Sequence, residues 1–147
     1  ISKENNYWSE IDYIKSNFKN IHISKNKDEY FKYVSMARIC ICSYLATTFL
    51  EMMAANVTVI LFVPFPKKIY NLTTLKKFKI MKKNNIFFEN YKDAAKFVNK
   101  NWNNIDDWWF SRSVQNARKE FINTFAYVNQ NILNSVAIEL KKGSFKR

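Results

Sequence analysis

Apolar and polar positions repeat along the chain with two periods, one typical of buried strands and the other of amphipathic helices. The run VTVILFV at 57–63 is almost wholly apolar and rich in β-branched residues, which indicates a strand buried on both faces. In 71–84 an apolar residue recurs at every third position from Leu72 to Met81, with lysines between. This spacing predicts a helix with one face in the core and the other in solvent.

The same patterns predict strands that alternate with helices along the whole chain. The predicted strands are residues 20–24, 38–44, 57–63 and 86–90. The predicted helices are residues 7–18, 26–37, 47–56, 71–84, 91–104 and 108–140, the last with a bend or break near Asn123 or 129–131. No Asn-Gly pair separates the strands, so hairpins are not indicated. We therefore expect an α/β fold, with a Rossmann-like parallel sheet of about four strands, helices on both faces and a long C-terminal helix.

The turn between the strand 38–44 and the following helix is the first candidate site. Ligands of parallel sheets bind beyond the carboxyl ends of the strands, where Tyr44, Ala46, Thr47 and Thr48 are expected. Backbone N–H groups at a helix start favour a phosphate, and the two threonines add hydroxyl donors. Glu51 follows one helical turn later, where its carboxylate can accept hydrogen bonds from a ribose diol. The combination suits a nucleotide-linked substrate.

A purely structural role explains the same residues. In a capping box, the Thr48 hydroxyl would bond to the amide of Glu51 and the Glu51 carboxylate to the amide of Thr48. Such a box needs no ligand, and the spacing of the two residues alone does not separate the alternatives.

Further candidates precede or follow the predicted strands. His22, in the first strand, is a candidate contact for a phosphate or a nucleobase, or an ordinary strand histidine. Lys25 and Lys67 follow strands, where they would neutralise a diphosphate leaving group or remain solvated loop residues. The tryptophans 102, 108 and 109 are either a platform for an acceptor sugar or aromatic residues that join a loop to the sheet.

The net charge suggests anionic partners without selecting one. The chain has 24 Lys and Arg against 12 Asp and Glu, a formal net charge of +12. Nucleic acid, a phosphate-bearing substrate and an acidic membrane surface all fit this charge. An AT-rich coding bias fits it as well, because Lys, Asn, Ile, Phe and Tyr abound and Gly143 is the only glycine. A basic nucleic-acid-binding α/β module therefore remains an alternative to a nucleotide-binding enzyme.

The two cysteines are interpreted as core residues. Cys40 and Cys42 point to the same face of one predicted strand, where a disulfide would be strained and further metal ligands are lacking. This favours reduced thiols and a cytosolic location.

Three stretches together resemble a known family. ARICICSYLATTFLEMMAANVTVILF, IFFENYKDAAKFVNKNW and DDWWFSRSVQNARKEFINTFA are similar to the C-terminal part of a bacterial surface-carbohydrate transferase family. That family is associated with O-antigen and lipopolysaccharide synthesis and is similar to glycosyltransferases of the GT-B fold. The resemblance covers residues 20–128, and its most specific elements are Y-x-x-T-T-F-L-E and the tryptophan pair followed by V-Q-x-A-R-x-x-F.

The resemblance implies a function for the candidate site. GT-B enzymes have two Rossmann-like domains, and the C-terminal one binds the sugar nucleotide. Carried over, Glu51 would hold the ribose, while Thr47 and Thr48 would meet the phosphates. The chain would be the donor-binding half of a glycosyltransferase-like enzyme of cell-surface polysaccharide or lipopolysaccharide synthesis, with a nucleotide sugar as substrate and no metal. A related phosphotransferase or a nucleotide-sugar epimerase that uses the same donor fold is a further alternative.

The beginning of the chain at Ile1 adds expectations about the whole protein. We expect residues 1–147 to form a single domain, the C-terminal fragment of a two-domain protein, inactive alone. The N-terminal domain would supply the base and the glycan or lipid-linked acceptor. No stretch reaches the ~18 apolar residues of a membrane span, so we expect a cytoplasmic protein with peripheral contact at the inner face of the membrane. The apolar stripe in 121–136 extends past the last strand, which favours a homodimer.

Overall fold

The structure is a computed structural model that describes residues 10–24 and 29–126, without the side chains of Glu10, Lys67 and Ile69. The chain divides into two compact units, Ile1–Met36 and Ala37–Arg147, and each is described by itself. The prediction of one domain over residues 1–147 stays a prediction.

The first unit contains two short helices, α1 (Glu10–Asn17) and α2 (Tyr30–Met36). The predicted strand at 20–24 is wrong, because residues 21–24 are neither helix nor strand. A strand is stabilised by the hydrogen bonds of a neighbour, and this short segment has none in the described part of the chain. Its apolar alternation therefore predicted a strand, which the local sequence alone does not stabilise.

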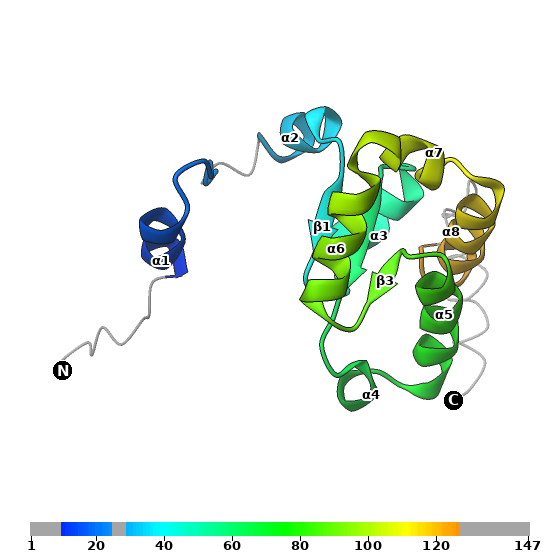
Figure 1. The fold of residues 1–147 in the computed structure, drawn as a ribbon. Coiled ribbons are helices and arrows are strands. Elements are labelled where there is room, and N and C mark those ends of the chain that lie inside the picture. The colour runs from blue at the N-terminus through cyan, green and yellow to red at the C-terminus, as the bar shows by residue number, and fades with distance from the viewer. Residues whose placement is uncertain (1–9, 25–28, 127–147) are drawn as a thin grey trace, which may run out of the picture. The chain divides into compact units, whose positions relative to one another are not determined.

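The second unit is built on a small parallel sheet (Figure 1). Its strands are β1 (Cys40–Cys42), β2 (Val59–Phe62) and β3 (Phe87–Phe88), in the order β1-β2-β3. The register pairs Ile41 with Ile60 and Leu61 with Phe87. The parallel α/β prediction is confirmed, with three strands in the described residues instead of about four.

The helices of this unit follow the predicted order with two differences. They are α3 (Thr47–Ala54), α4 (Pro66–Ile69), α5 (Leu72–Lys83), α6 (Tyr91–Asn101), α7 (Ile105–Trp109) and α8 (Arg112–Phe125). The short helix α4 was not predicted; Pro66 stands at its start, where a proline loses no hydrogen bond. The predicted helix 108–140 is already interrupted at Ser111, whose backbone is extended. Helix α8 ends at Phe125, close to the predicted break at Asn123, and 127–140 lies outside the described residues.

One face of the sheet is covered by α3 and α5, with α8 packed against both helices. Aromatic rings join these layers. The Phe78 ring of α5 stacks on Phe87 of β3 with centroids 4.3 Å apart and on Phe121 of α8 at 6.4 Å, and Phe121 meets Phe49 of α3 at 5.9 Å. Phe121 is only 1% exposed, so this part of the stripe 121–136 lies in the core of its own domain instead of at an interface.

The opposite face of the sheet carries α6. Ile60 and Phe88 point to this side and form a buried cluster with Ala94 and Val98 of α6. Successive residues of a strand point to opposite faces, so Leu61 and Phe87 face α5 while their neighbours face α6. The expectation of helices on both faces is confirmed.

Candidate functional site

The turn after β1 leads directly into helix α3, as the sequence predicted. Strand β1 ends at Cys42, and Ala46 is the N-cap of α3 with an extended backbone (φ −136°, ψ 178°). No side chain accepts a hydrogen bond from the first turn of α3. The backbone N–H groups of this turn therefore remain available to an anion, and they lie at the carboxyl end of a parallel strand.

The capping box is not formed. Helix α3 starts at Thr47, so Thr48 is its second residue and cannot act as the N-cap. Glu51 lies one turn later with an exposed side chain, and its carboxylate has no hydrogen bond or ion pair within the described residues. The capping-box alternative for Thr48 and Glu51 is wrong, because the helix begins two residues earlier than a box with Thr48 as the N-cap requires.

The turn is fixed to the next loop by a tyrosine that the sequence did not single out. The Leu45 N–H donates to the Tyr70 hydroxyl at 3.3 Å, across 25 positions of the chain. The Tyr70 ring meets Phe78 of α5 edge-on, with centroids 5.2 Å apart. Tyr44, next in the turn, is 65% exposed. Tyr70 therefore connects the turn to the core while leaving the Tyr44 side chain in solvent.

The remaining predicted site residues are not assembled with this turn. His22 belongs to the first unit, outside any strand, and its Nε2 lies 3.0 Å from the Tyr33 hydroxyl. Lys25 lies outside the described residues. Lys67 is placed by its backbone in α4, which follows β2 at the same edge of the sheet as the turn. The structure thus brings together Tyr44, Ala46, Thr47, Thr48 and Glu51 on one turn and one helix.

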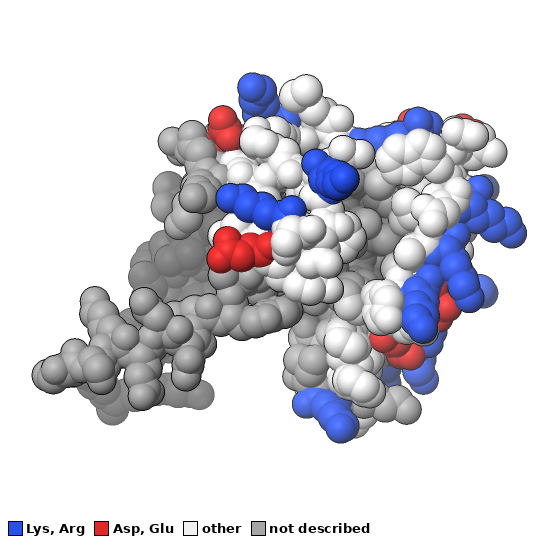
Figure 2. Space-filling view, turned by 60° about the vertical axis from the view of Figure 1, so that its left-hand side comes forward, with Lys and Arg blue, Asp and Glu red and all other residues white. Residues whose placement is uncertain are grey.

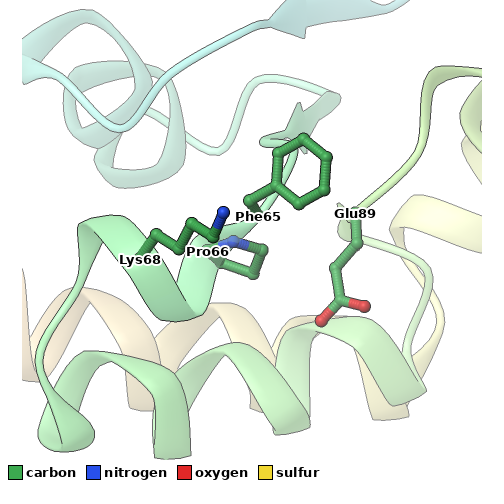
Figure 3. Close-up of a pocket in the computed structure, with 4 residues that line it drawn as sticks. All are labelled: Phe65, Pro66, Lys68 and Glu89. Carbon is green, nitrogen blue, oxygen red and sulfur yellow. The ribbon is translucent and has the colours of Figure 1, made fainter.

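A hollow of about 400 Å³ lies at the carboxyl ends of β2 and β3 and is lined by Phe65, Pro66, Lys68 and Glu89. Figure 3 shows Lys68 and Glu89 on two sides of it, with the Phe65 ring above Pro66. Phe65 has a left-handed backbone (φ 54°, ψ 49°), and its side chain is 71% exposed. A non-glycine residue in this conformation is uncommon and carries strain. The Lys68 Nζ lies 5.4 Å from the centre of the Phe65 ring.

Trp108 and Trp109 contact the edge of the sheet where the strands begin, opposite the turn after β1. Trp108 donates its indole N–H to the Asn84 carbonyl at 3.0 Å, and Trp109 donates to the carbonyl and the side-chain oxygen of Asn56, both at 3.2 Å. Asn56 follows α3 and Asn84 follows α5, so both acceptors precede the amino ends of strands. These two tryptophans therefore join loops to the sheet, and the sugar-platform interpretation is wrong for them.

Trp102 differs from this pair. Its side chain is 46% exposed, and the Arg38 guanidinium lies 5.3 Å from the centre of its ring. The same guanidinium donates to the Asn103 carbonyl at 3.2 Å. Trp102 is thus held by a surface cation–π contact instead of by the core.

The cysteines behave as core thiols. Cys40 and Cys42 are free and half-buried, opposite Val59 and Leu61 on one face of the sheet. Burial raises the pKa of both thiols, and burial together with the neighbouring Cys40 raises the pKa of Cys42 to about 11. Both thiols are therefore protonated at neutral pH and poor nucleophiles. In residues 10–24 and 29–126, no three His, Cys, Asp or Glu side chains cluster as metal ligands would.

Basic side chains are spread over the described surface. On the face drawn in Figure 2 they gather along the right-hand border, with few acidic side chains among them. The ion pairs Lys77–Glu120 (2.9 Å) and Lys82–Glu89 (2.8 Å) use two lysines of α5. The other exposed lysines of α5, Lys76, Lys79 and Lys83, form no ion pair within the described residues.

The model of the LIC12162 family transferase matches residues 2–140, nearly the whole chain. Neither a curated protein nor a solved structure matches it. Among the described helices, none has the length and apolar character needed to cross a membrane.

Proposed function

Because the chain belongs to the LIC12162 transferase family, we propose that it is the donor-binding half of a glycosyltransferase-like enzyme of cell-surface polysaccharide or lipopolysaccharide synthesis, with a nucleotide sugar as donor. One observation carries the proposal. The first turn of α3 has no side-chain cap, it lies at the carboxyl end of β1, and a carboxylate without a partner in the described residues follows one turn later. This is the arrangement that a nucleoside diphosphate needs.

The diphosphate would bind at the start of α3. The N–H groups of the first turn and the positive end of the helix dipole favour its charge, and the exposed Thr47 hydroxyl adds a donor. Thr48 is half-buried beside it. These groups carry no net charge, so Lys67 and Lys68 of helix α4, which follows β2 at the same edge of the sheet, would neutralise the charge of the diphosphate.

The ribose would bind to Glu51. Glu51 lies four positions after Thr47, a rise of about 6 Å along the helix. That offset separates a diphosphate at the helix start from a diol one turn later. An ionised carboxylate accepts hydrogen bonds from both hydroxyls of the diol, and charge-assisted bonds of this kind are the stronger ones.

Transfer breaks the bond between the sugar C1 and the diphosphate oxygen, and the nucleoside diphosphate leaves with the electron pair. The acceptor hydroxyl forms the new bond to C1 and gives its proton to a base. The residues of this chain would stabilise the negative charge on the leaving diphosphate without a metal. The base and the glycan or lipid-linked acceptor belong, in this proposal, to an N-terminal domain at the cytoplasmic face of the membrane.

The experiment compares Glu51→Gln with the unchanged chain in calorimetric titrations with UDP, CDP, GDP and inorganic pyrophosphate. We expect Glu51→Gln to weaken the preferred nucleotide about tenfold or more, the cost of one charge-assisted bond, and to leave pyrophosphate unchanged. Asp107→Asn, an exposed carboxylate at the opposite edge of the sheet, is the matched control. If Glu51→Gln lowers the affinities for nucleotide and pyrophosphate equally, or lowers neither, Glu51 does not bind the ribose.

The charge supports nucleic-acid binding as a second candidate function. Lysines 76, 79, 82 and 83 are exposed along α5. A nucleic-acid-binding module would show an RNA or DNA affinity that falls steeply with salt, and no response to free nucleotides. A nucleotide response together with weak polynucleotide binding excludes this candidate.

A further inference from the structure

A second cavity opens between helix α5 and the end of β3. Its volume is about 430 Å³. Its walls are mainly apolar, with lysines at the side and one acidic residue. The lining residues are Pro66, Leu72, Leu75, Phe78, Phe87, Lys76, Lys79, Lys82 and Glu89. Cavities of this size and composition are typical of small-molecule sites.

The apolar stripe of α5 continues from the core into this cavity. Phe78 and Met81, in the second half of the helix, are 2% and 0% exposed. Leu75 is half-buried, and Leu72, at the start of the helix, is 77% exposed. The same face of one helix is therefore covered at one end and uncovered at the other. The described residues provide no side chain to cover Leu72.

The charge at the cavity is positive. The only carboxylate of the lining, Glu89, is already paired with Lys82 at 2.8 Å. Lys76 and Lys79 are exposed and form no ion pair or hydrogen bond within the described residues. They stand three positions apart on α5 and so project from the same side of the helix. Two ammonium groups without a partner in the described residues thus border an uncovered apolar surface.

We propose that this cavity binds an amphipathic anion, a molecule with a short apolar chain and one phosphate or carboxylate head. The chain lies against Leu72, Leu75 and the edge of Phe78. The head lies between Lys76 and Lys79, whose ammonium groups supply the complementary charge. No residue of α3 or of the turn before it is among the lining residues, so the inference does not depend on nucleotide binding there.

The probe is decyl phosphate below its micelle concentration, titrated into the full chain and followed by calorimetry and by amide chemical shifts. Inorganic phosphate tests the phosphate head of the ligand and decanol tests its alkyl chain. Both should bind much more weakly than decyl phosphate. Shortening the alkyl chain of the ligand from decyl to octyl should weaken binding about fourfold for each CH₂ that is buried. The largest shifts should fall on α5 amides between Leu72 and Lys79.

Two variants on the same helix test the position of the head. Lys79→Gln should weaken decyl phosphate about tenfold, because it removes one charge-assisted contact. Lys83→Gln, an exposed lysine of α5 that does not line the cavity, should change the affinity less than twofold. Leu72→Asp replaces an exposed side chain, so it should leave folding intact. It should abolish the binding of decyl phosphate, because the alkyl chain loses its apolar contact.

Three results would overturn the proposal. Inorganic phosphate binding as tightly as decyl phosphate would mean that only charge is recognised. If Lys79→Gln and Lys83→Gln lower the affinity for decyl phosphate equally, the lysines of α5 act through net charge, without a defined site for the phosphate head. Binding to vesicles of anionic lipid, with no binding of monomeric decyl phosphate, would mean that this face docks on a membrane surface instead of holding one molecule.

Discussion

Replacing Trp109 by phenylalanine removes the indole N–H that holds the turn between α3 and β2. Trp109 is 0% exposed, and its N–H is shared between the carbonyl and the side-chain oxygen of Asn56, at 3.2 Å each. Asn56 has a left-handed backbone (φ 59°), so the turn depends on its contacts to stay in place. Losing the bond costs about 1 kcal/mol, and the space left by the smaller ring costs roughly 1–2 kcal/mol more. We expect a total loss of about 2–3 kcal/mol in the free energy of unfolding.

Urea unfolding followed by circular dichroism measures this loss, with the slope m expected to stay unchanged. Trp102→Phe is the matched control, because Trp102 is 46% exposed and its indole makes no hydrogen bond within the described residues; it should cost less than about 1 kcal/mol. If Trp109→Phe costs no more than Trp102→Phe, the tryptophan pair does not hold the amino edge of the sheet.

Three more predictions concern catalysis, assembly and pH. If the base and the acceptor site belong to another domain, as we propose, residues 1–147 alone should transfer no sugar; turnover of any nucleotide sugar onto a glycan or lipid acceptor would contradict this. The homodimer expected from the stripe 121–136 now depends on its residues beyond the buried Phe121; if they are uncovered, sedimentation equilibrium should show a concentration-dependent dimer, and a monomer at all concentrations, unaffected by Phe125→Asp, would contradict this. Because the pKa of Cys42 is raised from 9.0 to about 11, stability should fall as pH rises from about 9 through 11, where only the unfolded thiol ionises. Cys42→Ala should weaken this dependence, and an unchanged pH profile would contradict the shift.

Hydrophobic periodicity predicted the elements that a buried sheet requires. The run 57–63 became β2, and the segments on either side of it became α3 and α5. These elements form because their apolar residues face a shared core. The segment 20–24 has a similar alternation but no strand, since a strand also needs a hydrogen-bonded neighbour. Periodicity identifies which face can be buried and does not identify the partner that buries it.

The parts that sequence did not predict depend on single backbone positions or on distant contacts. Helix α3 starts at Thr47 as predicted, but its N-cap is Ala46, two residues before Thr48, which excludes the capping box that the spacing of Thr48 and Glu51 allowed. The break at Ser111 interrupts an apolar stripe without any proline or glycine. Tyr70 contacts Leu45 across 25 positions, and no local pattern marks such a contact. The βα turn itself was predictable, because its place after a strand follows from the parallel topology.

The most direct test of the proposed function is an NMR titration of the full chain with UDP, CDP and GDP. The proposal predicts that at least one nucleotide shifts the amides of residues 44–51 before and more than all others. It also predicts that Glu51→Gln reduces the nucleotide response and leaves the pyrophosphate response of the Thr47 and Thr48 amides intact. If millimolar nucleotide leaves residues 44–51 unperturbed, the start of α3 is not the donor site.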